Sequence, residues 1–307
     1  MEEEVNHLLY RRLGRTGILV SEISFGAHLK QVNIVDRDRR YRQIQVALEN
    51  GINLFDIYDH SGYKQWEPMS EWLQPVRDSV LISLCTVWNP DKVLDEVDYA
   101  LKVFRTDHID LYRFVISENA EENGKRLHAL LQAKAEGKIQ TVGGVCHVPS
   151  LTVKALKDHP IELEFLMLPA TFCFPRALSQ KTRIGHLINQ LDTGVIVMKP
   201  FTGHVGDAPA HLFELNPRDP ELEDLKRKGL RLGKAILKAL LQYPLVSTVM
   251  PSMDEVEEVL ENVSASGAGA LTEEEERLLE GYRRELFSKD PKTVLKEHRW
   301  MWNWRLT

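Results

Sequence analysis

Short apolar runs alternate with longer segments of mixed polarity along most of the chain. Most of these runs are continuous rather than alternating, which is typical of parallel strands that are buried on both faces. The runs that we expect to form strands are ISFGA (23–27), INLFD (52–56), VLISL (80–84), HIDLYRF (108–114), IQTVGGV (139–145), LEFLML (163–168), VIVMK (195–199) and VSTVM (246–250).

The segments between these runs carry apolar residues at helical spacing and end at helix-stopping residues. RDRRYRQIQVALEN ends at Asn50-Gly51, and TRIGHLINQLDTG ends at Gly194. A helix between successive strands is what a parallel crossover requires. Eight such units predict an α/β fold, a closed (β/α)8 TIM barrel. An open doubly wound sheet is the alternative, but no GxGxxG motif follows an early strand.

The two ends of the chain extend this single barrel domain, which we place over residues 1–307. YRRLGRTGILVSEI contains two extended runs around the turn-forming residues Arg15-Thr16-Gly17, so residues 1–22 are expected to form a β-hairpin that caps the barrel. A charged helix, TEEEERLLEGYRREL, precedes an aromatic tail over residues 287–307. The tail is a candidate for a fold-back over the barrel or for a contact in a homo-oligomer.

Composition narrows the classes of partner. The chain has 307 residues, 43% hydrophobic residues and a formal net charge of -6. That charge argues against a general nucleic-acid binder, which needs a basic face. The start of the chain, MEEEVNHLLYRR, lacks the apolar core of a signal peptide, and no apolar run approaches the ~20 residues that span a bilayer. We therefore expect a cytoplasmic protein with no membrane partner, whose three cysteine residues need no disulfide framework.

Five segments together resemble the aldo-keto reductase family. They are YRRLGRTGILVSEISFGA, ALENGINLFD, ALKVFRTDHIDLYRF, GVIVMKPF and LVSTVMPSMDEVEEVLENV, and they occur in the family's order over nearly the whole chain. The resemblance implies the barrel fold and NADPH-dependent reduction of a small carbonyl substrate. In that reaction a Tyr protonates the carbonyl oxygen, a Lys paired with an Asp lowers the pKa of the Tyr, and a His orients the substrate.

Residue by residue, three of these four groups are missing. Asp56 matches the family's Asp, but Ser61 stands at the Tyr position, Cys85 at the Lys position and Val115 at the His position. Tyr58 and Tyr63 lie nearby. We take Asp56 as the catalytic or orienting carboxylate, with Tyr63 or His60 as a non-standard acid. Cys85 is a further candidate, although a thiol needs a neighbouring cation or His to become a nucleophile.

The cofactor side of the resemblance is also altered. His147 follows the fifth predicted strand, and Lys199, which ends the seventh, is placed by the resemblance near cofactor phosphates. The motif after the eighth strand, MPSMDEVEEVLEN, supplies Ser252 and Asn262 as further candidates. It also supplies Asp254, which would repel the 2′-phosphate of NADP. The expected cofactor is therefore NADP or NAD.

Two other functions stay open from the sequence. In the first, the barrel has lost its catalytic groups and acts as a ligand-binding or regulatory protein. In the second, the protein is a non-redox lyase or hydrolase that uses His, Cys and Asp residues near strand ends, with or without a metal ion. Those residues are His28, Asp56, His60, Cys85, His147 and Cys173. Without HxH or HExxH spacing we assign no metal ligands, so a divergent nicotinamide-dependent reductase is the preferred interpretation.

Overall fold

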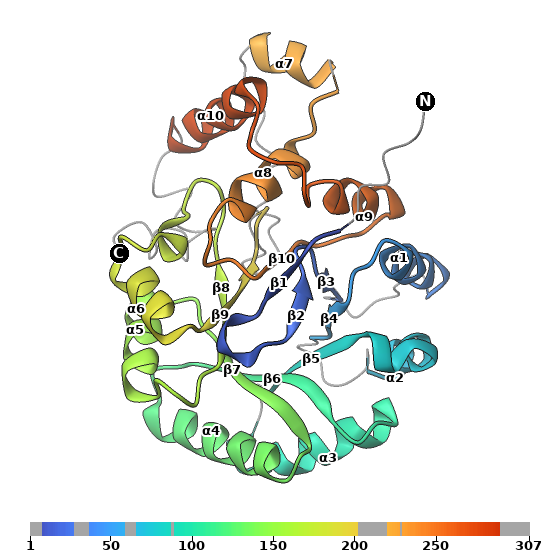
Figure 1. The fold of residues 1–307 in the computed structure, drawn as a ribbon, viewed down its shortest axis with the longest axis vertical. Helices are drawn as coiled ribbons and strands as arrows, with labels where there is room; N and C mark the ends of the chain where they lie inside the picture. Colours follow the sequence, from blue (N-terminus) through green and yellow to red (C-terminus); the bar gives the residue numbers. More distant parts are fainter. Residues whose placement is uncertain are drawn as a thin grey trace.

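The eight expected strands lie side by side in one parallel sheet that curls into a barrel (Figure 1). The structure is a computed structural model and describes residues 8–27, 37–58, 66–86, 89–201, 220–227 and 229–288. The strands are β3 (Phe25–Gly26), β4 (Leu54–Asp56), β5 (Leu81–Thr86), β6 (Ile109–Val115), β7 (Ile139–Val145), β8 (Phe165–Pro169), β9 (Gly194–Met198) and β10 (Thr248–Met250). Their order in the sheet follows the sequence, which is the order that successive βα units produce.

The barrel closes between the segment before β3 and β10. Ile23 forms an isolated parallel bridge with Val249. There the amide of Ser24 donates to the carbonyl of Val249 at 3.0 Å, and the amide of Val249 donates to the carbonyl of Glu22 at 2.8 Å. The (β/α)8 prediction is thereby confirmed, and the open doubly wound sheet is wrong.

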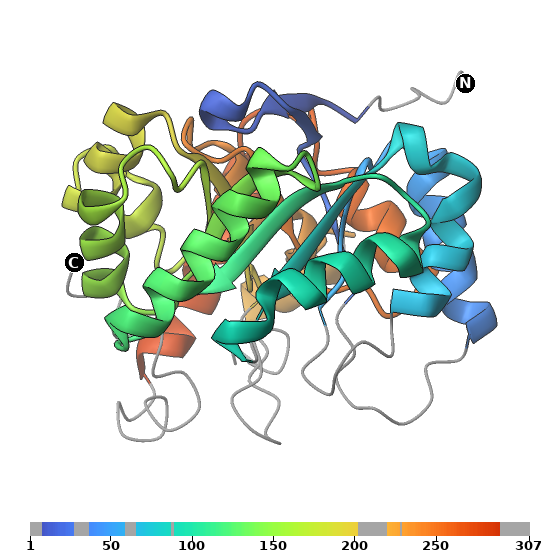
Figure 2. The same cartoon turned by 90° about the horizontal axis from the view of Figure 1, so that it is seen from below.

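Helices surround the barrel (Figures 1 and 2), as the crossover argument predicts. They are α1 (Arg37–Glu49), α2 (Trp66–Leu73), α3 (Val93–Phe104), α4 (Ala120–Ala135), α5 (Pro149–Asp158), α6 (Arg183–Leu191), α7 (Pro220–Arg227), α8 (Leu232–Leu241), α9 (Val256–Val263) and α10 (Glu273–Ser288). Short 3-10 helices are η1 (Gly14–Thr16), η2 (Gln74–Ser79), η3 (Pro90–Lys92) and η4 (Arg176–Leu178).

The ends of α4 show how local sequence sets these helices. The side chain of Asn119 accepts a hydrogen bond from the amide of Glu122 and caps the first turn. Two acidic residues lie in that first turn and Lys134 lies in the last, which suits the helix dipole. Gly137 then adopts a positive φ of 76°, as glycine does after a helix, and the chain turns into β7.

The barrel interior holds a core of its own, separate from the core between barrel and helices. We call it the lumen cluster. Its buried members are Leu13, Val20, Leu54, Cys85, Leu111, Val145, Phe165, Met167, Ile196, Met198 and Met250, and Ile18, Tyr58, Leu81 and Val115 pack against it half-buried. Most of these residues come from strands, and the alternation of side chains along a strand assigns their positions to the inner face.

The predicted N-terminal hairpin is confirmed and closes one end of the barrel. Strands β1 (Tyr10–Arg12) and β2 (Leu19–Ser21) pair in antiparallel register, and the hairpin lies across that end (Figure 2). Leu13 and Val20 enter the lumen cluster from it. Gly14 has a φ of +50°, and a Cβ on it would lie 2.2 Å from the backbone nitrogen of Gly194, so this contact needs glycine.

Arg15 fixes the hairpin to the barrel through backbone carbonyls. Its guanidinium donates to the carbonyl oxygens of Leu191 at 2.5 Å, Pro160 at 3.1 Å, Ile161 at 2.9 Å and Leu163 at 2.6 Å. These carbonyls lie in the segments that lead into β8 and β9. One half-buried side chain therefore supplies hydrogen-bond donors to two strand entries.

The far end of the chain is described as far as Ser288, where α10 ends. The aromatic tail predicted for residues 287–307, with Trp300, Trp302 and Trp304, lies almost wholly outside the described residues. Its role as a lid or subunit contact stays a prediction.

We predict that Arg15→Ala lowers the free energy of unfolding by about 2–4 kcal/mol, because several carbonyls lose a charged donor at once. Urea denaturation measures the change. Arg12→Ala is the matched control. Arg12 lies on the same hairpin as Arg15 and forms an ion pair with Asp192, in which both side chains are about half exposed. That exposed pair should be worth under about 1 kcal/mol. Equal effects of the two substitutions would contradict the proposed anchoring by Arg15.

Candidate active site

A buried polar cluster interrupts the apolar lumen toward the carboxyl ends of β4, β5 and β6. We call this end of the barrel the mouth. Asp56, Ser83 and Arg113 occupy strand positions two residues away from lumen-cluster members, so they share the inner face. Asp56 and Ser83 are fully buried, and Arg113 is 2% exposed.

Asp56 and Arg113 form a bidentate ion pair. The guanidinium contacts both carboxylate oxygens, and its contact to Oδ2 is 2.9 Å long. Ser83 lies between them, because its hydroxyl donates to Asp56 Oδ1 at 2.7 Å and accepts from Arg113 at 2.8 Å. The three side chains therefore link three neighbouring strands within the lumen.

Electrostatics favour the charged form of this pair despite its burial. Burial lowers the pKa of Arg113, but the charge of Asp56 and its hydrogen bonds outweigh that effect, so the pKa of Arg113 is raised above its ordinary value. Arginine stays protonated in proteins in any case. The lumen thus holds a permanent cation whose position is set by Asp56 and Ser83.

The register of the sheet makes room for Arg113. Arg113 is paired with Cys85 on β5 and with Gly143 on β7. Gly143 in turn is paired with Phe165, and a Cβ on Gly143 would lie 2.5 Å from the Phe165 ring. A glycine at this position therefore lets an aromatic ring and a guanidinium occupy neighbouring parts of one narrow lumen.

Tyr58 follows Asp56 by two residues and packs half-buried against the lumen cluster. The guanidinium carbon of Arg113 lies 6.0 Å from the centre of its ring, at the outer range of a cation–π contact. The tyrosine therefore lies two residues past the end of β4, nearer the mouth than Asp56 and close to the buried cation.

Cys85 does not have the environment of a nucleophile. Burial raises the pKa of its thiol to about 12, although the charge of Arg113 acts in the opposite direction. The Sγ atom donates only a weak hydrogen bond, 3.7 Å long, to the carbonyl of Thr86. The thiol stays protonated near neutral pH, and a thiolate is the reactive form of cysteine.

Lys199, predicted near cofactor phosphates, directly follows β9 at the mouth. Its backbone has a φ of +58°, which is unusual for a residue other than glycine. Burial lowers the pKa of its amine, and no carboxylate contributes to oppose that shift. Among the described residues it has no ion-pair partner, so an anionic ligand group would suit it.

The motif after β10 places its two candidates differently. Ser252 is exposed, whereas Asn262 in α9 is 3% exposed. The Nδ2 atom of Asn262 is buried without a hydrogen-bond partner in the part of the chain that the structure describes. Buried amide groups nearly always have a partner, so this donor is free for a ligand acceptor.

The start of α9 is capped by acidic side chains of its own segment. Glu258 accepts hydrogen bonds from the amides of Asp254 at 2.6 Å and Glu255 at 3.2 Å, and Glu255 completes a capping box. Glu255 is also paired with Arg39 of α1 at 2.7 Å. The helix end that would attract an additional phosphate in other proteins is therefore occupied by carboxylates.

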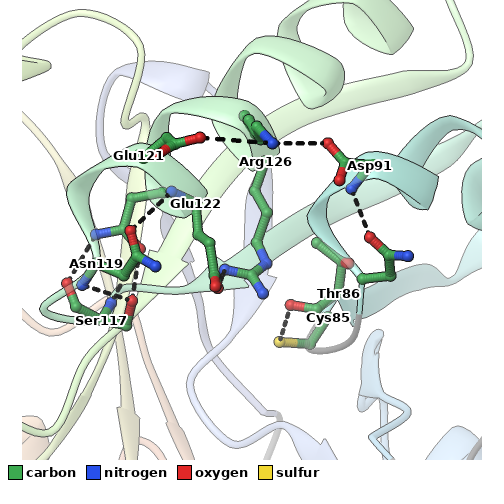
Figure 3. A network of polar contacts seen from close by, with 11 residues as sticks. Cys85, Thr86, Asp91, Ser117, Asn119, Glu121, Glu122 and Arg126 are labelled. Carbon is green, nitrogen blue, oxygen red and sulfur yellow. Dashed lines mark hydrogen bonds and ion pairs between the residues drawn. The ribbon is translucent and has the colours of Figure 1, made fainter.

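Two segments at the mouth are tied together by polar contacts (Figure 3). Lys125 of α4 lies 3.0 Å from the carboxylate of Asp91 in η3, the short helix after β5. Asn119 caps α4 itself, directly after β6. The Lys125–Asp91 contact therefore links the segments that follow β5 and β6, the strands that carry Ser83 and Arg113.

Several predicted site residues cannot be placed. His28, His60, Ser61 and Tyr63 lie outside the described residues. His147 follows β7 at the mouth and is half-buried, so its position agrees with a role there without testing it. Within the described ranges, no three His, Cys, Asp or Glu side chains are grouped closely enough to hold a metal ion.

The residue that sequence reasoning missed is Arg113. A signal for it was present, because HIDLYRF reads as an apolar strand in which Arg113 has the same parity as Leu111 and Val115. A charge on the buried face of a strand needs a partner. The sequence could have flagged that need, but only the register identifies Asp56 as the partner.

A family model agrees with the resemblance drawn from the sequence. The model described as "Aldo/keto reductase family" matches residues 22–283.

No helix in the described part of the chain is long and apolar enough to cross a membrane.

Individual proteins similar to this chain carry related names. An uncharacterized oxidoreductase, YqkF, of Bacillus subtilis is 22% identical over 90% of this chain and 96% of its own length. L-galactose dehydrogenase of Arabidopsis thaliana is 26% identical over 83% of this chain and 87% of its own length. The aldo-keto reductase AKR11C1 of Bacillus halodurans, in its holo form, superimposes with a TM-score of 0.68 at 23% identity. That match covers 90% of this chain and 96% of the other.

We predict that Asp56→Asn and Arg113→Gln each lower the free energy of unfolding by about 3–5 kcal/mol, because each leaves one buried charge unpaired. The double variant Asp56→Asn/Arg113→Gln removes both charges and should lose clearly less than the sum, with a coupling of about 1–3 kcal/mol. Urea unfolding of the four proteins measures this cycle. Additive losses would show that the pair is not coupled in solution.

Proposed function

The chain belongs to the aldo/keto reductase family, and from that membership we propose that it reduces a small carbonyl compound with a nicotinamide dinucleotide as hydride donor. The observation that supports this most is the Asp56–Arg113 pair at the mouth. A carboxylate–cation pair remains in the lumen even though the lysine position is Cys85. The cation is supplied by the neighbouring strand.

The described residues fit such a dinucleotide at two points. Lys199 offers an amine without a carboxylate partner among the described residues, and its strained backbone is the kind of feature that persists at functional sites. Asn262 offers a buried amide donor that has no hydrogen-bond partner within the described ranges. We infer that Lys199 binds the phosphates and that Asn262 binds a polar edge of the nucleotide. When bound, the reduced nicotinamide supplies the hydride.

The protein's own part in the reaction is electrostatic and protonic. As the carbonyl carbon is reduced, its oxygen gains negative charge, and a fixed positive group nearby favours that change. Arg113 is such a group, because Asp56 and Ser83 hold its orientation before the substrate arrives. The oxygen must also receive a proton. Tyr63 and His60 stay candidates for that step, outside the described residues.

We infer that NAD is preferred over NADP. Asp254 and Glu255 directly precede α9, Glu257 and Glu258 lie in its first turn, and Glu258 already accepts from the amides of Asp254 and Glu255. An additional 2′-phosphate near these carboxylates would be repelled. Arg39 offsets part of this charge, but it is already paired with Glu255.

The proposal of a small-molecule reductase is tested by titrating the protein with NADH and NADPH while following tryptophan fluorescence. We expect saturable quenching by NADH. A panel of aldehydes and ketones then tests turnover with the bound cofactor. No binding of either nucleotide at millimolar concentration would exclude hydride transfer and would favour the alternative of a ligand-binding barrel without redox chemistry.

We predict that Asp254→Arg strengthens NADPH binding by at least about tenfold, because one repulsive charge becomes attractive and a tenfold change corresponds to about 1.4 kcal/mol. NADH affinity should change little. Glu273→Arg is the matched control, since Glu273 is an exposed acidic residue in the first turn of another helix, α10. An unchanged ratio of NADPH to NADH affinity in Asp254→Arg would contradict the placement of the 2′-phosphate beside α9.

A further inference from the structure

Tyr58 has a position that the function proposed so far does not use. It lies two residues beyond Asp56, packs against the lumen cluster and stays half-buried rather than fully enclosed. The Asp56–Arg113 pair lies below it in the lumen. A hydroxyl-bearing side chain therefore lies at the boundary between the buried ion pair and the mouth, where a small substrate would enter.

Arg113 and Tyr58 interact as a cation and a potential anion. The guanidinium carbon lies 6.0 Å from the ring centre. Burial lowers the pKa of Arg113, whereas Asp56 and an ionised Tyr58 act in the direction that raises it. This attraction is mutual, so Arg113 stabilises a phenolate at Tyr58 to the same extent.

The groups nearest Tyr58 in the lumen, namely Arg113, Asp56 and Cys85, are poor sources of a proton. Arginine does not release its proton near neutral pH. Asp56 is fully buried and paired with Arg113. Cys85 is buried, and its pKa of about 12 makes it a weak acid with little access to the mouth. Tyr58 combines an O–H group, partial exposure and a neighbouring cation.

We propose that Tyr58 is the proton donor of this site and that Arg113 is its positioning residue, an assignment that rests on the proposed reductase function. The carbonyl carbon accepts a hydride from the reduced nicotinamide, and the π bond of the carbonyl opens toward its oxygen. That oxygen takes the proton of the Tyr58 hydroxyl. The products are the alcohol, the oxidised nicotinamide and a Tyr58 phenolate, which water reprotonates.

Tyr58→Phe removes the proton and keeps the ring. We expect kcat to fall by about 10²–10⁴-fold, the usual contribution of a general acid, with NADH affinity by fluorescence unchanged. Tyr41→Phe, which alters an exposed tyrosine of α1 outside the lumen, is the matched control and should leave kcat unchanged. If Tyr63→Phe abolishes turnover and Tyr58→Phe does not, the assignment to Tyr58 is overturned.

The pH profile tests the role of Arg113. Reduction needs a protonated donor, so kcat falls as pH rises past the ionisation of that donor. The double variant Asp56→Asn/Arg113→Gln removes the cation without leaving an unpaired charge, and this fall should move to higher pH as the overall rate drops. Arg113→Lys keeps a cation and should keep the fall near its original pH. If the double variant and the wild type lose kcat at the same pH, Arg113 has only a structural role.

A readout without turnover separates this inference from the proposed function. The near-ultraviolet absorbance of tyrosinate follows ionisation of the tyrosine residues during an alkaline titration of the protein alone. The first tyrosine to ionise should be missing in Tyr58→Phe and delayed in the double variant, whether or not any nucleotide binds. Identical titrations of the wild type and Tyr58→Phe below the bulk transition would refute the assignment. Absent nucleotide binding would refute only the reductase proposal.

Discussion

The ion pair between Asp56 and Arg113 is the constraint on which the rest of the lumen depends. Removing two ions from water costs several kcal/mol per ion, and close pairing with further hydrogen bonds is needed to recover it. Ser83 supplies those further bonds from the strand between them. Apolar side chains can often replace buried ion pairs without loss of stability. The presence of this pair among Leu, Met and Phe side chains is therefore no evidence that it makes the fold more stable than an apolar core would.

An arginine on β6 differs in chemistry, as well as in position, from the lysine on β5 that the family resemblance implies. The family resemblance implies a lysine at Cys85, and the sheet register pairs Cys85 directly with Arg113. In this chain the positive charge next to Asp56 lies on β6, one strand away from the position that the resemblance assigns to lysine. A guanidinium holds a carboxylate in a fixed plane and cannot act as an acid. In the proposed reaction the Asp56–Arg113 pair therefore has an electrostatic role, and the proton comes from a separate group.

The sequence predicted what depends on local pattern. Continuous apolar runs identified eight strands, and the residues Arg15-Thr16-Gly17 identified the hairpin turn. The run ISFGA became only a two-residue strand, because its members serve two neighbours: Ile23 bridges to Val249, and Phe25–Gly26 pairs with β4. This division of one run between two neighbouring strands arises from barrel closure, and a local sequence pattern does not predict it.

The candidate site was harder to predict, because side chains from three strands meet in it. Asp56 was identified from its place at a strand end, but its partner Arg113 lies 57 residues away along the chain. Which residues face each other across a lumen depends on the stagger of all the strands, and a single sequence does not encode that stagger in any one segment. Alternation alone places Arg113 on the inner face. It does not select Asp56 from the other acidic residues of the chain.

The two ends of the barrel differ in the kind of residue that they carry. At the hairpin end, Arg15 satisfies carbonyls that lead into β8 and β9, and Leu13 fills the lumen. At the mouth, Lys199 has a strained backbone and an amine without an ion-pair partner among the described residues. The chain therefore closes the same barrel even though other residues stand at three of the four positions that the family resemblance implies to be catalytic. The fold therefore constrains the site only through the requirement that any buried charge in the lumen be paired.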